Sequence, residues 1–300
     1  MNKVTVVVTT YNGERFLAQQ LHSLLMQTLM PAEIIICDDG STDNTNQLIE
    51  SFLPNPIIRY IRNESQLGVI QNFKKAVALA TPGNYIALCD QDDIWLPQKL
   101  EKSAEALAAI EQAGKPAMIY SDLTLIDTEG NLLNSSVNNE TGQDKYRHCF
   151  ETLLFGNFVT GCTVLMNTEM KHYFATIPNN AQYQHDAWIA LVAFTMGNIS
   201  MLNQPYIQYR KHDQNVTFSK HNKKNRIQRL ANHLVSLFTT NDFLEEQIEL
   251  VKAFYHQYRQ QITPIQQKTI ESFLQLKHSN YLKKKTAFEK AFKNHWLKRF

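Results

Sequence analysis

The sequence predicts an α/β protein: a mostly parallel β-sheet flanked by helices, followed by a C-terminal α-helical extension. Three observations support this prediction. Short apolar, β-branched runs alternate four times with segments of helical periodicity, which is typical of a doubly wound parallel sheet. Polar clusters follow three of these runs, and right-handed crossovers bring the C-terminal ends of parallel strands to one rim. Residues 220–300 show no strand pattern.

The composition is that of an ordinary soluble protein, because 43% of the 300 residues are hydrophobic and 19% are charged. The net charge of +2 gives no electrostatic reason to expect a nucleic-acid partner. Four cysteines are scattered without a Cys-x-x-Cys pair, which indicates free thiols in a reducing compartment. The chain enters a strand at once and has no apolar run of 18 residues, so we expect a cytoplasmic protein without a membrane span.

In the first half of the chain, predicted strands alternate with predicted helices. Residues 4–9 are β-branched throughout, which suits a strand covered on both faces, and Tyr11-Asn12-Gly13 breaks that strand. Apolar residues from Phe16 to Leu25 then recur with helical periodicity. The same cycle predicts strands at 33–37, 57–61 and 84–89, and helices at 41–52, 68–80 and 97–113.

The second half is mixed. We expect two strands and a hairpin in 117–131, a polar loop over the rim at 134–146, a strand at 158–166, a helix at 185–196, and short strands at 198–203 and 206–209. We place a domain boundary near residue 220, which separates an α/β domain at 1–219 from an α-helical region at 220–300. Helical spacing in that region covers 227–238, 241–259, 263–278 and 280–298, after a basic cluster at 220–229.

Three carboxylates follow the strand at 84–89 within four positions: Asp90, Asp92 and Asp93. Gathering negative charge at the mouth of a hydrophobic strand is unfavourable unless a cation binds there. A divalent, oxygen-seeking ion such as Mg²⁺ or Mn²⁺ prefers such ligands. The alternative is a solvated acidic turn that caps the helix beginning at Pro97. Polar clusters at the ends of two other strands favour the metal site.

The first of these clusters, Thr9 to Asn12, ends the first strand, and the second, Asp38 to Ser41, ends the second strand. The Asp38 cluster is consistent with a turn and helix cap, or with a carboxylate that accepts a hydrogen bond from the N–H of a pyrimidine base. The chain contains no GxxxxGK[ST] or GxGxxG sequence, which disfavours the common ATPases and dinucleotide-binding enzymes.

Two later groups of residues are further candidates for catalysis or ligand binding. Asp186 stands at a predicted helix start, where it can act as an N-cap or as a general base that removes a proton from an attacking hydroxyl. Arg210 can pair with phosphate oxygens and His212 with phosphate or a metal, although each alone is also consistent with a structural role.

The order of these motifs resembles the inverting glycosyltransferases of family 2. The motifs are VTTYNG at 8–13, ICDDGSTD at 36–43 and DQDDIW at 90–95. The resemblance covers about the first 220 residues and implies the GT-A (Rossmann-like) fold of that family's catalytic domain. Later residues resemble the branch of the family that includes bacterial rhamnosyltransferases of surface-polysaccharide assembly. These residues are Gly161, 185–188, 209–212 and Asn215.

The resemblance also implies roles for single residues. Asp90 and Asp92 would hold the metal that bridges the two phosphates of the donor, and Asp186 would be the catalytic base. We add Asp93 and His212 as metal ligands. The residues assigned to substrate binding are Thr9, Tyr11, Asn12, Asp38, Asp39, Gly68, Asn72, Asp90, Gln91, Trp188 and Arg210. The segment 63–68 is longer than the family's Asn-x-Gly, and His185 stands where many relatives have Glu, which leaves the acceptor contacts open.

These residues predict a metal-dependent inverting glycosyltransferase. A single base would deprotonate the acceptor hydroxyl, which attacks the anomeric carbon from the opposite face, while the metal offsets charge on the leaving nucleoside diphosphate. By the resemblance, the donor is dTDP-rhamnose or a UDP-sugar, and the acceptor is a saccharide or a lipid-linked molecule of cell-surface polysaccharide biosynthesis. The alternatives are a sugar-nucleotide pyrophosphorylase, whose Gly-rich, Arg-containing loop is missing at 9–13, and a non-catalytic nucleotide-sugar-binding module.

The basic helical region also has more than one interpretation. Its lysines and arginines can form a solvated face, or they can dock the protein peripherally at the inner face of the cell membrane, where lipid-linked acceptors reside. Homo-oligomerisation through these helices is equally compatible with the sequence.

Overall fold

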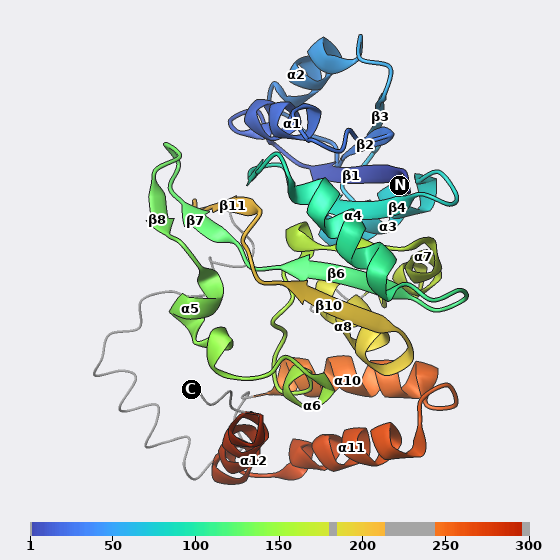
Figure 1. The fold of residues 1–300 in the computed structure, drawn as a ribbon, viewed down its shortest axis with the longest axis vertical. Helices are drawn as coiled ribbons and strands as arrows, with labels where there is room; N and C mark the ends of the chain where they lie inside the picture. The colour runs from blue at the N-terminus through green and yellow to red at the C-terminus, as the bar shows by residue number, and fades with distance from the viewer. Residues whose placement is uncertain (1, 180–184, 214–243, 296–300) are drawn as a thin grey trace. The chain divides into compact units, whose positions relative to one another are not determined.

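The computed structural model describes residues 2–179, 185–213 and 244–295 (Figure 1). The chain divides into two compact units. The first unit contains 1–140 and 159–210, and the second contains 141–158 and 211–300. The predicted boundary at 219/220, the predicted helix at 227–238 and the whole basic cluster at 220–229 fall outside the described residues, so they stay predictions.

A seven-stranded sheet organises the first unit, with the order β10-β6-β9-β4-β1-β2-β3. Only β9 runs antiparallel to its neighbours, and every other pair is parallel. All residues of β1 and β4 are buried, as expected for strands covered on both faces. The strands are β1 (Val4–Thr10), β2 (Glu33–Asp38), β3 (Ile58–Arg62), β4 (Tyr85–Cys89), β6 (Ala117–Ser121), β9 (Leu165–Met166) and β10 (Asn198–Leu202). The mixed α/β architecture with a mostly parallel sheet is therefore confirmed.

Helices cover both faces of this sheet. In Figure 1, α4 lies in front of β6 and β10, and α8 lies behind them. Helix α3 packs on β1 and β2 and also contacts α7, which in turn contacts α8. The helices are α1 (Leu17–Leu25), α2 (Thr45–Phe52), α3 (Val69–Leu79), α4 (Lys99–Ile110), α7 (Thr168–Ala175) and α8 (His185–Met196).

A second, four-stranded sheet extends the first unit, with the order β5-β11-β7-β8. Strand β11 runs antiparallel to β5 and parallel to β7, and β7 and β8 form the predicted hairpin. These strands are β5 (Ile94–Trp95), β7 (Thr124–Ile126), β8 (Leu132–Asn134) and β11 (Ile207–Arg210). Because β5 directly follows Asp90–Asp93, this sheet anchors one end of the acidic loop.

The second unit is helical in its described part. It contains η1 (Gln143–Lys145), α6 (Phe150–Leu153), α10 (Glu245–Tyr258), α11 (Pro264–Leu274), η3 (Gln275–His278) and α12 (Tyr281–Asn294). A capping box between Thr263 and Gln266 starts α11, and the Asn280 side chain accepts from the Lys283 N–H to start α12. Phe155 packs edge to face against Phe273, with 5.0 Å between ring centroids. Among the described helices, none is both long and apolar enough to cross a membrane.

Three local predictions were wrong. The expected strand at 158–166 is reduced to β9, because Gly161–Thr163 turns as a 3₁₀ helix, η2. The expected polar loop at 134–146 contains α5 (Val137–Thr141) and η1. Helix α7 was not predicted, although its N-cap Asn167 accepts a hydrogen bond from the Met170 N–H.

Candidate active site

The polar clusters after β1, β2 and β4 meet at one rim of the large sheet. Thr10 pairs with Asp38 across β1 and β2, and Val8 pairs with Cys89 across β1 and β4. The Asp39 N–H donates to the carbonyl of Thr10 at 2.8 Å. This register brings residues 9–12, 38–41 and 90–93 side by side, as the alternating pattern predicts.

Gln91 ties the end of β4 to the end of β1. Its Oε1 accepts from Thr10 Oγ1 at 2.6 Å and from the Tyr11 N–H at 2.8 Å, and its Nε2 donates to the Tyr11 carbonyl at 3.2 Å. A Cβ at Gly13 would lie 2.6 Å from Gln91 Oε1, so a side chain at position 13 would push the end of the Gln91 side chain aside. Gln91 therefore holds Tyr11, whose side chain is 40% exposed at the rim.

Asp38 faces into the protein. Its carboxylate is fully buried, accepts from Ser41 Oγ and from the Ser41 N–H, and lies 3.6 Å from the Nε of Arg62. Ser41 Oγ in turn accepts from the Asn12 N–H at 2.8 Å. In this structure Asp38 and Asn12 shape the loop. The predicted contacts of Asp38, Asn12 and Thr9 with a ligand stay predictions, and Thr9 is 9% exposed.

Asp39 holds the segment before α3. Its carboxylate accepts three hydrogen bonds of 2.8 Å, from Asn63 Nδ2 and from the N–H groups of Leu67 and Gly68. The amide of Asn72 supports the same segment, because it donates to the Cys37 carbonyl at 2.8 Å and accepts from Asn63 at 3.0 Å. Asp39, Gly68 and Asn72 thus form one network, which the three separate predictions did not foresee.

The acidic loop, Asp90 to Asp93, forms a candidate metal site together with Cys162, which the sequence did not single out. One ligand atom each of Asp90, Asp93 and Cys162 lies within 4.8 Å of the others. Burial, followed by the charges of Asp92 and Asp186, raises the pKa of Asp90 to about 7. Burial, followed by Asp92 and Asp90, also raises the pKa of Asp93 well above its usual value.

These residues fit a divalent, oxygen-seeking cation. Asp93 Oδ2 is buried without a hydrogen-bond partner, and a cation beside it would offset the mutual repulsion of the acids. Burial raises the pKa of the Cys162 thiol, so this thiol stays protonated and braces Asp93 through a hydrogen bond. Asp92 lies in the same loop, half-buried. His212 belongs to the second unit, and its predicted role as a metal ligand stays a prediction.

Asp186 lies in the first turn of α8, close enough to the acidic loop for its charge to affect Asp90. Its carboxylate accepts from the Ala187 N–H at 2.7 Å and from the Gly161 N–H at 3.2 Å. Burial nevertheless raises the pKa of Asp186 to about 6, which is close to the range that suits a general base. The structure thus joins the acidic loop and the candidate base, which are distant in sequence.

The comparisons with known proteins fit this geometry. Residues 5–148 match the sequence profile of glycosyl transferase family 2. The matched segment makes up just under half of this chain. The chain is 27% identical over 227 residues to an uncharacterized glycosyltransferase of a Nostoc species, which covers 71% of this chain and 66% of the relative. It is 36% identical over 107 residues to the putative glycosyltransferase EpsE of Bacillus subtilis, which covers 35% of this chain and 38% of EpsE.

Solved structures share the fold of this chain. Crystalline S. aureus TarS 1–349 in complex with UDP-GlcNAc superposes with a TM-score of 0.62 at 17% identity, covering 96% of this chain and 79% of TarS. The mannosyltransferase PcManGT of Pyrobaculum calidifontis, in complex with GDP-Man and Mn²⁺, gives 0.57 at 17% identity, covering 97% and 73%. The chain spans just under two thirds of the curated relatives that it matches first, at 66% and 65% of their lengths.

A neutral histidine stands next to the candidate base. Burial lowers the pKa of His185 to about 4, so its imidazole carries no charge near neutral pH. Its ring packs on Phe73, with 4.5 Å between centroids, and a Cβ at Gly161 would lie 2.6 Å from its Nε2. Trp188, predicted to bind substrate, is fully buried in α8, so in this structure it packs in the core.

Two buried cations stand behind the acidic loop, and the sequence analysis missed the first. Lys99 is 1% exposed, with its Nζ 3.4 Å from the centroid of the Trp95 ring, and burial lowers its pKa to about 8. A lysine in the first turn after Pro97 is usually solvated, so only the packing reveals it. The second is Arg210, whose guanidinium is bonded to protein acceptors on several sides.

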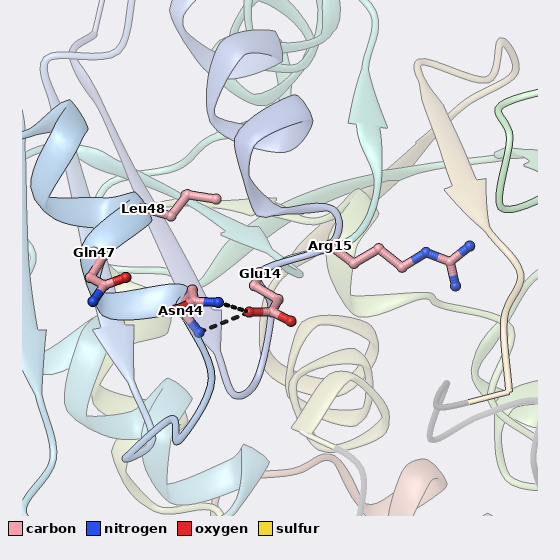
Figure 2. Close-up of a pocket in the computed structure, with 5 residues that line it drawn as sticks. All are labelled: Glu14, Arg15, Asn44, Gln47 and Leu48. Carbon is pink, nitrogen blue, oxygen red and sulfur yellow. Dashed lines mark hydrogen bonds between the residues drawn. The ribbon is translucent and has the colours of Figure 1, made fainter.

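A hollow of about 680 Å³ lies near the start of α1 and α2 but contains no predicted site residue (Figure 2). It is lined by Glu14, Arg15, Asn44, Gln47 and Leu48. The Glu14 carboxylate accepts from the backbone and side-chain N–H groups of Asn44 at 2.9 and 2.8 Å, while Arg15 points away from them. We assign this hollow no role in the chemistry.

Proposed function

We propose that the protein is a metal-dependent inverting glycosyltransferase, which moves a sugar from a nucleotide-diphosphate sugar to a hydroxyl of a saccharide or lipid-linked acceptor. One observation carries the proposal. Asp186, on α8, lies so close to the acidic loop that its charge contributes to the raised pKa of Asp90. A cation site beside a buried carboxylate provides both functions that the reaction needs: stabilisation of a leaving diphosphate and removal of a proton.

Each group has a stated role in this proposal. Asp90, Asp92 and Asp93 would hold the divalent cation, which supplies positive charge for the departing nucleoside diphosphate. The Asp186 carboxylate accepts the proton of the acceptor hydroxyl. The hydroxyl oxygen forms a bond to the anomeric carbon as the bond from that carbon to the diphosphate oxygen breaks on the opposite face. This single displacement inverts the anomeric configuration, because no carboxylate forms a covalent intermediate.

The relatives support a nucleotide-sugar donor and a divalent metal. TarS is described with UDP-GlcNAc, and PcManGT with GDP-Man and Mn²⁺. For this chain we propose dTDP-rhamnose or a UDP-sugar, used in cell-surface polysaccharide biosynthesis. Thr9, Tyr11 and the Asp39 network would form the nucleotide side of the pocket, since they share the rim with the acids.

A donor panel tests the proposal. Purified protein is incubated with UDP-sugars, dTDP-rhamnose and GDP-mannose, with and without Mn²⁺ or Mg²⁺, while thermal shift reports binding and nucleotide release reports turnover. We expect one donor to bind and turn over only with metal, and we expect the Asp92→Ala variant to lose turnover. Unchanged turnover in Asp92→Ala or in excess chelator would contradict the metal mechanism.

Two additions to this panel, a sugar 1-phosphate with a nucleoside triphosphate and a set of saccharide acceptors, separate the two alternative functions. A sugar-nucleotide pyrophosphorylase would form nucleotide-sugar and release pyrophosphate from a sugar 1-phosphate and a nucleoside triphosphate. A non-catalytic module would bind a donor without turnover in the presence of any acceptor.

We also propose that the C-terminal helical region contacts an anionic membrane surface, where lipid-linked acceptors reside. Lys283, Lys290 and Lys293 are exposed on α12 and recur at spacings of seven and three residues, which places them on one side of the helix. Homo-oligomerisation through these helices is the competing proposal.

A further inference from the structure

Arg210 ends β11 and is one of the largest fully enclosed side chains of the described residues, with 1% of its surface exposed. It contacts the acidic loop twice. Its backbone N–H donates to Asp93 Oδ1 at 3.2 Å, and its Nε donates to the Asp92 carbonyl at 3.0 Å. The β5–β11 ladder explains this approach: Ile207 pairs with Trp95 and Gln208 with Ile94, so continuing the register places Arg210 opposite Asp92.

The rest of the guanidinium joins the loop to two other elements. One terminal nitrogen, Nη1, donates to the carbonyls of Asp127 and Thr128 at 3.1 Å each, in the turn after β7. The other, Nη2, donates to Gln19 Oε1 on α1 at 2.7 Å. The guanidinium carbon lies 4.7 Å from the centroid of the Phe16 ring, which stacks the group in place.

Four of the five N–H donors of this guanidinium thus bond to protein oxygens. An arginine that binds phosphate presents its fork to the ligand, whereas this fork is used by three separate segments of the protein. A lysine could not replace it, because an ammonium lacks the planar spread that reaches all three.

We propose that Arg210 is a positioning residue of the acidic loop: it fixes Asp92 and Asp93 against the second sheet and α1, and thereby sets the affinity for the divalent cation. The inference rests on the proposed function and deepens its metal site. It differs from the pairing with phosphate oxygens that the chemistry of an arginine side chain suggests for Arg210. Residues that orient metal ligands commonly change metal affinity by about 10–100-fold when they are replaced.

The test measures metal binding without a nucleotide. Mn²⁺ affinity of the free protein is determined by electron paramagnetic resonance, and hydrogen exchange of residues 90–95 is followed by mass spectrometry. The variants are Arg210→Lys, which keeps the charge and loses the fork, and Gln19→Ala, which removes one acceptor on the exposed side of α1. Arg15→Lys is the matched control, because Arg15 is exposed and lies 4.7 Å from the same Phe16 ring.

We expect Arg210→Lys to weaken Mn²⁺ binding by roughly tenfold or more and to speed exchange at 92–95. Gln19→Ala should have a smaller effect in the same direction, and Arg15→Lys none. Unchanged Mn²⁺ affinity and exchange in Arg210→Lys, with weaker nucleotide binding, would overturn the inference in favour of a phosphate contact. If Arg210→Lys does not fold, unchanged affinity and exchange in Gln19→Ala overturn it.

The outcome is separable from that of the proposed function. A wild-type protein that binds no Mn²⁺ would contradict the metal mechanism and the effect on affinity, while the exchange data would still decide whether Arg210 holds the loop. A wild type that binds Mn²⁺ but transfers no sugar would contradict the activity alone.

Discussion

Asp186 shows how burial can give an ordinary carboxylate a pKa in the range that suits a general base. Two backbone N–H groups stabilise its charged form, yet removal from water dominates and raises its pKa to about 6. The neighbouring His185 does not counteract this effect, because burial lowers its pKa to about 4 and leaves it neutral. The pair therefore supplies one negative charge and no positive charge beside the acidic loop near neutral pH.

We predict a pH-rate profile that follows Asp186. A general base must be unprotonated, so kcat should rise as the pH increases through about 6 and level off above it. Asp186→Asn should lose activity by a factor on the order of 10²–10⁴ and lose this limb of the profile. The profile is measured at saturating metal at every pH, since the pKa of Asp90 is raised to about 7 and protons compete with the cation for its carboxylate.

Two results would contradict that assignment. One is a flat wild-type profile between pH 5 and 8. The other is an Asp186→Asn variant that keeps the wild-type profile at a lower rate. Mn²⁺ affinity of the variant serves as the control, because loss of metal binding would mean that the substitution acts through the acidic loop.

At the scale of elements, the segment between β3 and α3 depends on one glycine. Gly68 precedes α3 with φ 83° and ψ 161°, a region that essentially only glycine adopts. Its N–H donates to Asp39 Oδ2, so the conformation of Gly68 fixes the network that runs through Asn63 to Asn72. No atom lies within 4 Å of a Cβ built at Gly68, so the constraint is conformational and not steric.

Gly68→Ala should therefore destabilise the first unit by about 1–3 kcal/mol. In thermal unfolding we expect a decrease of several degrees in the midpoint, and weaker nucleotide binding. Gly156→Ala is the matched control, because Gly156 also has open space around a built Cβ but has no positive φ. Equal midpoints for the two variants would show that the Asp39 network does not depend on this conformation.

The elements that the sequence predicts well have long, regular patterns. The β-branched run of β1 and the apolar run of β4 are found as expected, and α8 matches its predicted bounds. The predicted strand at 158–166 was wrong because an apolar run indicates only that a segment is buried, not which backbone conformation it adopts. In the structure Gly161 turns the backbone and donates its N–H to Asp186. That choice depends on a contact 25 residues away, which periodicity does not contain.

The candidate site shows the same limit. The order of the strands alone places Asp39, Asp90 and Asp186 near one rim of the sheet, so the sequence pattern can predict that they lie close together. Side-chain direction depends on tertiary contacts, so Arg210 and Trp188 were assigned to substrate binding although both are buried among protein groups. Cys162 and Lys99 carried no recognisable signal, because a lone cysteine in an apolar run and a lysine in a first helical turn are both common.

At the scale of the molecule, the two units divide the proposed work. The profile match at 5–148 lies almost entirely in the first unit, which also holds the acidic loop and Asp186. The second unit supplies none of the groups in the proposed mechanism, apart from the untested ligand His212. Its exposed lysines on α12 accordingly support a role in locating an acceptor and not in chemistry.

We therefore predict that the protein associates with anionic vesicles through α12. Each lysine near such a surface contributes about 1 kcal/mol, so the triple variant Lys283→Gln/Lys290→Gln/Lys293→Gln should partition into phosphatidylglycerol vesicles about ten- to a hundredfold less. Sedimentation with vesicles at 0.1 M salt measures this, and wild-type binding should fall further as the salt is raised. Vesicles of phosphatidylcholine alone should bind neither protein.

The control removes the same charge from the first unit, as Lys3→Gln/Lys102→Gln/Lys115→Gln. Association that depends on α12 predicts strong binding of this control, whereas general attraction of a basic protein predicts equal losses in both variants. Sugar transfer to a short water-soluble acceptor should be unchanged in the α12 variant, because its lysines are absent from the proposed mechanism. If vesicle binding is unchanged but sedimentation equilibrium shows that the α12 variant loses self-association, the helix serves oligomerisation instead.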